Sequence, residues 1–312
     1  ISNYGKFKRF FDQLLDLAFE RKPEAIICID NPGFNLRFVR ALRQRAAGTD
    51  WRPRIIYYIS PQLWAWHSSR VHQIARDVDL LLSIFPFEKE WYAKRAPGLP
   101  VEFVGHPLCD RCPDLEFREP HELHDPPRLL LLPGSRAKEI SRHLPTMAAA
   151  ARKLSVEPMI VFPNESLAAQ ARLITPAVAD WDLRIGGLHE ALAEADVAIA
   201  SSGTVTLECA WFRVPTVVLY KTSWITYLLG RLFVKIKHIA MPNVLAEREV
   251  FPEFIQRAAT PQSLAREASR FLNNTSRRKT LRADLNQIAQ TLGQKGAAPR
   301  AAKAVVRLLA DA

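Results

Sequence analysis

The sequence lacks any uninterrupted apolar run of the roughly 18 residues that a membrane-spanning helix requires. It also has few glycines, 12 against 22 prolines, although 48% of its 312 residues are hydrophobic. This composition excludes a low-complexity polymer and a disordered chain, and it favours two ordinary domains with packed cores. No signal peptide is visible. Because the chain opens on Ile1, close to a helix expected over Phe7–Arg21, we expect further residues upstream.

Cysteine is also scarce, which excludes a disulfide framework and favours a reducing cytoplasm. Two of the four cysteines, Cys109 and Cys112, form a lone CxxC, and His121 and His124 are the nearby candidates for further zinc ligands. The surrounding residues 110–127 are acidic and proline-rich, more like a linker than a metal site. We therefore expect reduced thiols and predict no metal.

Negative charge is in deficit, because 43 Lys and Arg face 32 Asp and Glu, for a net charge of +11. The surplus favours nucleic acid, an acidic membrane surface or a phosphorylated substrate as partner. No RNP sequence, metal-knuckle spacing or tandem basic region is present, so we predict no nucleic-acid partner. The apolar and basic segment Trp224–Lys237 suits an interfacial helix on anionic lipid, or equally a buried helix with a basic end.

Short apolar runs alternate with amphipathic stretches, which predicts an α/β fold of buried parallel strands joined by helices. Two such series, separated by the linker, indicate two Rossmann-like domains. We place them at residues 1–115, which lack the first part of the domain, and 128–290, with 291–312 as a helix packing back on the first domain. The expected strands are Ala25–Ile29, Ile55–Ile59, Leu80–Ile84, Val101–Val104, Leu129–Leu132, Met159–Phe162, Val197–Ala200 and Thr216–Leu219.

Ligands of such sheets bind beyond the carboxyl ends of the strands, and for two facing domains the natural place is the cleft between them. In the second domain, one strand runs into Pro133-Gly134-Ser135-Arg136 and then a helix. Glycine permits a tight turn beside a ligand, backbone amides can hold phosphate, and arginine adds a forked cation. A plain helix N-cap with a surface arginine explains the same residues equally well.

A second small-residue turn, Ser201-Ser202-Gly203-Thr204, follows the strand Val197–Ala200. Glu208 comes one helical turn after Thr204, so its carboxylate can lie on the side of the turn and accept both hydroxyls of a ribose. The alternative is a buried glutamate paired with a local arginine. The position at a strand end favours a nucleotide site.

In the first domain, Asp30 ends a strand and is followed by Asn31-Pro32-Gly33-Phe34-Asn35. A carboxylate at such a strand end faces the cleft and, if partly desolvated, can act as general base toward a sugar hydroxyl. An aspartate that completes the turn before the next helix is the alternative.

Three further strand ends in the first domain carry ligand-binding residue types. Ser60-Pro61 leads to Trp64 and Trp66, which are a candidate platform for a sugar or an acyl chain, although aromatic residues are more often core. Phe85-Pro86-Phe87-Glu88 follows the third strand. His106 follows the fourth and can bond a ligand, although a structural histidine is the commoner outcome.

Taken together, these motifs resemble lipid-A-disaccharide synthase, in the same order and at similar spacing from about Lys22 to about Pro252. Any single motif is unspecific, but seven in order are hard to explain otherwise. They are Ile29-Asp30 to Asn35, Ser60-Pro61 to Trp66, Phe85 to Lys89, Gly105-His106, Pro133 to Arg136, Ser202-Gly203-Thr204 with Leu207-Glu208-Cys209, and Met241 to Ala246 with Arg248-Glu249.

The resemblance implies an inverting glycosyltransferase of the two-domain GT-B type, with parallel sheets facing across a cleft. That family joins UDP-2,3-diacylglucosamine to 2,3-diacylglucosamine 1-phosphate (lipid X) without a metal or other cofactor, at the cytoplasmic face of the inner membrane. It implies a donor domain at 128–290 and an acceptor domain at 1–115, and a homodimer is compatible with it. The implied residues are Asp30 and Arg136 for catalysis, Ser135, Arg136, Ser202, Gly203, Thr204, Glu208 and Asn243 for UDP, and Asn35, Ser60, Trp64, Trp66 and His106 for the acceptor.

The chain departs from the family pattern at two points. Gly33 stands where the family usually has a second aspartate, and the N-terminal Gly-Glu-x-Ser-Gly-Asp loop has no counterpart. Two alternatives therefore stay open. One is another GT-B enzyme of UDP-N-acetylglucosamine, such as the peptidoglycan transferase or the 2-epimerase; the other is a non-catalytic nucleotide-binding paralogue.

Overall fold

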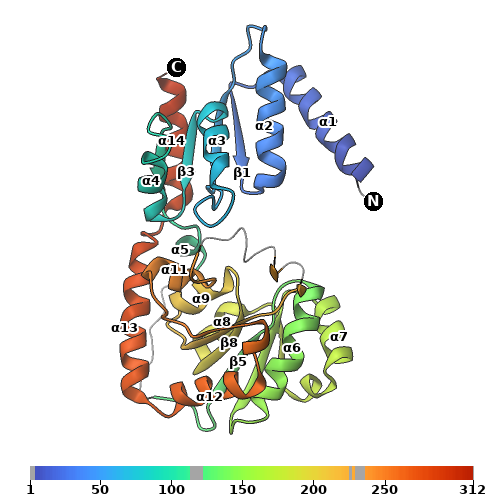
Figure 1. Cartoon of the computed structure of the whole chain (residues 1–312), viewed down its shortest axis with the longest axis vertical. Helices are drawn as coiled ribbons and strands as arrows, with labels where there is room; N and C mark the ends of the chain where they lie inside the picture. The colour runs from blue at the N-terminus through green and yellow to red at the C-terminus, as the bar shows by residue number, and fades with distance from the viewer. Residues whose placement is uncertain (1–3, 113–121, 225–226, 229–235, 312) are drawn as a thin grey trace. The chain divides into compact units, whose positions relative to one another are not determined.

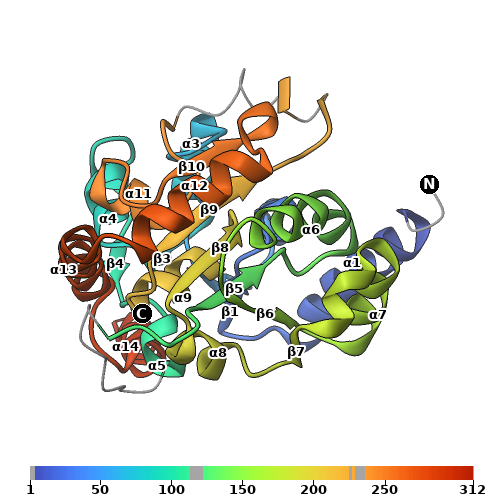
Figure 2. The ribbon, with the colours of Figure 1, turned by 90° about the horizontal axis from the view of Figure 1, so that it is seen from below.

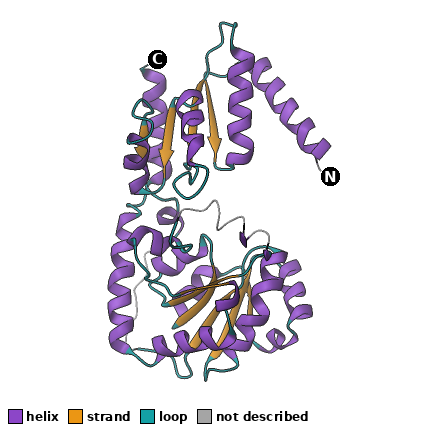
Figure 3. Cartoon of the chain, viewed as in Figure 1, coloured by secondary structure: helices purple, strands orange, loops and turns teal. Residues whose placement is uncertain are grey.

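Two parallel β-sheets organise the chain, one in each of two units (Figure 1). Unit 1 comprises Ile1–Arg111 and Thr291–Ala312, and unit 2 comprises Cys112–Gln290. The computed structural model describes residues 4–112, 122–224, 227–228 and 236–311. The chain thus enters unit 2 at Cys112, where the sequence placed the end of the first domain at residue 115. Helices flank the strands in both units (Figure 3), and the predicted α/β class is confirmed.

Unit 1 contains a four-stranded parallel sheet whose spatial order is the order of the sequence. Its strands are β1 (Ala25–Ile29), β2 (Arg54–Tyr58), β3 (Leu80–Ser83) and β4 (Val101–Phe103). Its helices are α1 (Tyr4–Arg21), α2 (Pro32–Ala46), α3 (Val71–Asp77), α4 (Pro86–Ala93), α5 (Leu108–Arg111) and α14 (Ala297–Ala310).

Successive residues of β2 point to opposite faces of this sheet, as the period of a strand requires. Ile55 and Tyr57 join the larger apolar cluster, to which α2 contributes several buried residues. Ile56 joins a second cluster with Ala301 and Ala304 of α14, so the C-terminal helix covers the other face. Residues of α14, more than 200 positions after β2 in the sequence, therefore complete the core of unit 1.

Unit 2 contains a six-stranded parallel sheet in the order β10-β9-β8-β5-β6-β7. Its strands are β5 (Arg128–Leu132), β6 (Glu157–Phe162), β7 (Asp182–Ile185), β8 (Val197–Ser201), β9 (Thr216–Tyr220) and β10 (Glu253–Ile255). Its main helices are α6 (Ala137–Ala151), α7 (Glu165–Ile174), α8 (Leu188–Glu194), α9 (Val205–Trp211), α11 (Met241–Ala246), α12 (Pro261–Leu272) and α13 (Thr275–Thr291).

The order of these strands reverses between β5 and β8. From β5 the chain moves outward through β6 and β7, then returns to place β8, β9 and β10 on the other side. Helix α12 packs beside α6, while α8 and α9 lie on the opposite face of the sheet (Figure 2). In open α/β sheets, such a reversal leaves a crevice at the carboxyl ends of the two central strands, which is where ligands bind.

All eight predicted strands are present, with ends displaced by at most two residues. The sequence analysis did not predict β7, in which polar and apolar residues alternate, or β10, which has only three residues. Helix α2 begins at Pro32, because proline is well suited to the first turn of a helix. The segment Trp224–Lys237, expected to be helical, lies mostly outside the described residues. Within the described ranges, no helix is long and apolar enough to cross a membrane.

Candidate active site

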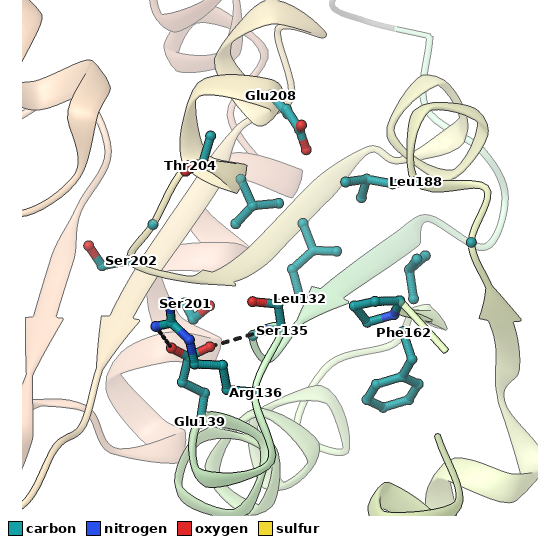
Figure 4. A pocket seen from close by; sticks show the side chains of 16 residues that line it. Leu132, Ser135, Arg136, Glu139, Phe162, Leu188, Ser201, Ser202, Thr204 and Glu208 are labelled. Atoms are coloured by element: carbon teal, nitrogen blue, oxygen red, sulfur yellow. Dashed lines mark hydrogen bonds and ion pairs between the residues drawn. The ribbon is translucent and has the colours of Figure 1, made fainter. Parts of the chain in front are cut away.

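A pocket of about 410 Å³ lies at the reversal point of unit 2 (Figure 4). It is bounded by the turn after β5, the turn after β8, and the ends of β6 and β7. The polar turns and an apolar wall therefore face a common space. Its lining residues are Leu132, Gly134, Ser135, Arg136, Glu139, Val161, Phe162, Pro163, Gly186, Leu188, Ser201, Ser202, Gly203, Thr204, Val205 and Glu208.

The turn after β5 presents a backbone amide and a guanidinium to this pocket. Gly134 adopts a φ of +123°, and a Cβ there would lie 2.6 Å from the Cβ of Glu139, so both conformation and space require glycine. The side chain of Arg136 is 80% exposed and its Nη1 lies 3.0 Å from Glu139 Oε1. An exposed arginine at the edge of a pocket can bind an anion with two parallel hydrogen bonds.

The turn after β8 is held by bonds that leave its pocket side open. Ser202 Oγ donates to the carbonyl of Ile239 over 2.9 Å, and Thr206 Oγ1 donates to the carbonyl of Gly203 over 2.8 Å. A Cβ built on Gly203 meets nothing within 4 Å, so the space beside this backbone is free for a ligand. The carboxylate of Glu208, from α9, points into the pocket although the residue is 8% exposed (Figure 4).

The apolar wall of the pocket comes from residues that the sequence analysis did not select. Val161 and Phe162 end β6 and Pro163 follows it, and Leu188 begins α8 after two glycines with positive φ, Gly186 and Gly187. Such a wall suits a flat, weakly polar ring such as a nucleobase. The double glycine before Leu188 was the available signal for this loop.

His143 is a second residue that the sequence analysis missed. It is completely buried in α6 and links the turn after β5 to the end of β9: its Nδ1 donates to the carbonyl of Pro133 over 2.8 Å, and its Nε2 accepts from the backbone amide of Lys221 over 3.0 Å. Burial lowers the pKa of His143, which keeps the ring neutral and suits one donor and one acceptor nitrogen. The ring therefore fixes the start of the β5 turn.

Asn243 differs from the prediction that it contacts the nucleotide. It is fully buried and is not among the residues that line the pocket. Its Nδ2 donates to the carbonyl of Phe251 and to Glu253, while its Oδ1 accepts the amides of Val250 and Phe251. Because an amide side chain has two donor hydrogens and two lone pairs, these four bonds satisfy it internally. Its role in this structure is to hold the loop before β10.

In unit 1, Asp30 follows β1 and its backbone is rigidly held. Its amide donates to the carbonyl of Tyr58 over 2.9 Å, and its carbonyl accepts from Tyr57 Oη at 2.6 Å and Asn35 Nδ2 at 2.7 Å. Asp30 and Asn31 both have positive φ, a conformation that these residue types tolerate best. Asp30 is exposed, so the condition of partial desolvation is not met within unit 1. The side chain of Asn35 donates to the carbonyls of Ile29 and Asp30 and so holds this turn.

The two tryptophans predicted as one platform have different surroundings. Trp64 Nε1 donates to Glu88 Oε1 over 3.1 Å and its ring packs edge-on against Phe87, whereas Trp66 is 47% exposed. Glu88, the third residue of α4, is completely buried, and that burial raises its pKa to about 7. Ser60 is also buried. Of this predicted set, Trp66 is the side chain that offers a surface to a ligand.

His106 and the two neighbouring cysteines also occupy structural positions. His106 is 5% exposed, its Nδ1 accepts the amide of Leu108 over 3.1 Å, and burial lowers its pKa to about 4. Cys109 Sγ lies 3.4 Å from the carbonyl of Gly293, and Cys112 Sγ lies 3.7 Å from His189 Nε2. Among the residues that the structure describes, no three His, Cys, Asp or Glu side chains are grouped as metal ligands.

Comparison with solved structures places this architecture in the GT-B fold. S. aureus MnaA in a co-structure with UDP matches with a TM-score of 0.65 and 13% identity, covering 97% of this chain and 80% of that one. The UDP-GlcNAc 2-epimerase of Neisseria meningitidis bound to UDP-GlcNAc matches with a TM-score of 0.61 and 10% identity, covering 98% and 81%. MurG of Acinetobacter baumannii matches with a TM-score of 0.55 and 16% identity, covering 97% and 77%.

Sequence comparison is more specific. The family model described as lipid-A-disaccharide synthetase matches residues 1–306. The lipid-A-disaccharide synthase of Myxococcus xanthus (strain DK1622) is 38% identical, over 95% of this chain and 78% of that protein. The lipid-A-disaccharide synthase of Nitrosococcus oceani is also 38% identical, over 88% of this chain and 72% of that protein.

These findings do not favour the two alternatives. The epimerase and MurG likenesses, at 16% identity or less, show the fold alone, whereas the family model and the similar relatives are synthases. Enzymes of this kind are glycosyltransferases that form the lipid A disaccharide from a nucleotide sugar and a lipid acceptor. The chain belongs to the lipid-A-disaccharide synthase family.

Proposed function

We propose that the chain transfers 2,3-diacylglucosamine from UDP to the 6-hydroxyl of 2,3-diacylglucosamine 1-phosphate, with inversion at the anomeric carbon. The observation that carries this proposal is the pocket of unit 2, in which two small-residue turns, an exposed arginine, an inward carboxylate and an apolar wall face one another. This combination matches the parts of a nucleoside diphosphate, because each part has a partner of complementary chemistry.

In the proposed donor complex, the uracil ring lies against Phe162 and Leu188, and Glu208 accepts the ribose hydroxyls. The diphosphate accepts hydrogen bonds from the backbone amide of Ser135 and the guanidinium of Arg136, and it occupies the open space beside Gly203. A hydrogen bond to a charged group typically contributes about 1.5–3 kcal/mol. Positive groups held at this position stabilise the charge that develops on the departing UDP, and the proposal therefore requires no metal ion.

Asp30 is the proposed general base. Its carboxylate takes the proton of the acceptor 6-hydroxyl, the oxygen forms a bond to the anomeric carbon, and the bond from that carbon to the diphosphate breaks with its electron pair leaving on UDP. Three hydrogen bonds hold the Asp30 backbone, which fixes the point from which the carboxylate extends. Fixed positioning of a reacting group accounts for much of the rate that a general base supplies. Exposed Trp66 remains a candidate contact for the acceptor.

We also propose that the protein associates peripherally with an anionic membrane surface. The net charge of +11 supports this partner, and so does a local group of described residues at the end of β9. Trp224 and Leu228 are 56% and 63% exposed, and Lys221 and Arg257 line a pocket with Trp224. Exposed apolar side chains beside cations are typical of interfacial binding. Self-association into a homodimer stays a prediction, which sedimentation of the intact protein would test.

A substitution in the donor pocket tests the proposed function. Glu208→Gln keeps the size of the side chain but weakens its acceptance of two ribose hydroxyls. We expect formation of the disaccharide from the two lipid substrates to fall at least about tenfold, because hydrogen bonds to a charged partner are lost. Binding of UDP should weaken in parallel. If both product formation and UDP affinity equal those of the unaltered protein, this pocket does not take part in the reaction.

A further inference from the structure

Glu139 occupies the same donors that the proposed diphosphate site requires. Its Oε2 accepts the backbone amide of Ser135 over 3.1 Å, and its Oε1 lies 3.0 Å from Arg136 Nη1 (Figure 4). The residue lies on the first turn of α6 and lines the pocket. A carboxylate presents two anionic oxygens, as a phosphate does, so it can satisfy the same pair of donors.

An ordinary helix-capping role explains part of this geometry. A glutamate in the first turn of a helix stabilises the positive end of the helix dipole, typically by about 0.3–1 kcal/mol. Such a role accounts for the bond to the amide of Ser135. The i,i+3 ion pair with Arg136 goes beyond the cap, because it engages the guanidinium with another side chain of the same pocket.

Close contact with the turn after β5 places the carboxylate beside these two donors. Gly134 leaves room for it, since a Cβ at that position would lie 2.6 Å from both Cβ and Oε2 of Glu139. The glutamate is partly buried, with 27% of its side chain exposed, whereas its partner Arg136 is 80% exposed. The exposed arginine can therefore change partner at little cost, while the glutamate stays beside any ligand of the pocket.

We propose that Glu139 is an internal competitor of the diphosphate, holding the Ser135 amide and Arg136 until the donor displaces it and returning to them when UDP leaves. This inference rests on the proposed donor site. It implies that Glu139 weakens the binding of a nucleoside diphosphate, has no effect on the neutral nucleoside, and assists release of the product.

Glu139→Gln tests this competition because it removes the negative charge and keeps the size of the side chain. We expect titration calorimetry at low salt to show UDP binding about fivefold tighter or more, a change typical of removing one close like charge. Uridine affinity should stay within about twofold, and the gain for UDP should shrink at high salt, where screening is stronger. Glu165→Gln is the matched control, because Glu165 pairs with Arg172 on α7 outside the pocket.

The competing explanation gives the opposite result. If Glu139 orients Arg136 for the phosphate, Glu139→Gln will bind UDP more weakly, and weaker or unchanged binding overturns the inference. Glu139→Ala, checked for folding by its melting temperature, provides the same comparison should the glutamine variant not fold. If the unaltered protein does not bind UDP at millimolar concentration, the donor site itself is refuted. If it binds UDP but Glu139→Gln does not bind it more tightly, only the competition is refuted.

Discussion

Replacing Arg136 by alanine separates binding of the diphosphate from stability of the fold. The side chain is 80% exposed and its ion pair with Glu139 is at the surface, so its removal should change the free energy of unfolding by less than about 1 kcal/mol. In the proposed complex, the guanidinium instead makes a charged hydrogen bond to phosphate, worth about 1.5–3 kcal/mol. We therefore expect UDP affinity to fall by roughly 10-fold to 150-fold.

Calorimetric titration with UDP measures this effect, and uridine provides the internal control because it lacks the diphosphate. Arg172→Ala is the matched variant, since Arg172 also pairs with a glutamate on unit 2 but does not line the pocket. Its UDP affinity should equal that of the unaltered protein. If Arg136→Ala binds UDP with normal affinity, Arg136 does not contact the diphosphate. If it loses affinity for uridine to the same degree, the loss reflects a change in the pocket and not a missing phosphate contact.

Three further predictions concern the base, a buried acid and the membrane. Asp30→Asn should lower steady-state turnover by about 100-fold or more while UDP affinity barely changes, and near-normal turnover would rule out Asp30 as the base. Burial raises the pKa of Glu88 from its ordinary value of 4.5 to about 7, so the stability that Glu88 contributes is present at low pH and is lost as the pH rises from 4.5 through 7. The melting temperature of Glu88→Gln should therefore rise relative to that of the unaltered protein across this range. Parallel curves of melting temperature against pH would contradict the assignment. Trp224→Glu combined with Leu228→Glu should reduce flotation with anionic vesicles, and undiminished flotation would place the membrane contact elsewhere.

Local sequence patterns predicted most of the strands because parallel strands that are buried on both faces are short continuous apolar runs. Leu129–Leu132 and Val197–Ala200 are of this kind, and each is followed by a turn of small residues that the structure places in the pocket. This pattern did not predict β7, where Asp182 and Arg184 alternate with apolar residues at the edge of the sheet. A four-residue alternating segment does not stand out from a loop.

Which residues line the site depends on the pairing of strands, which local sequence patterns do not reveal. Phe162 ends β6 and Leu188 follows β7, and both reach the pocket because these two strands lie on one side of β5 while β8 lies on the other. Burial is likewise a property of the packed fold, so Asn243 was predicted to contact a ligand although its amide is used entirely inside the protein. Glu88 and His143 were overlooked as buried polar groups for the same reason, since both lie in amphipathic helices.

The most direct test of the account is the position of the nucleotide on the chain, measured by hydrogen exchange of backbone amides with and without UDP. We expect slower exchange within residues 134–139 and 202–208, at the reversal point of the sheet of unit 2, and unchanged exchange within residues 25–35 of unit 1. Amides that bond to a ligand, or that a ligand covers, open less often and exchange more slowly. Slower exchange confined to residues 25–35, with none around the two turns of unit 2, would show that the donor binds to the other half of the protein.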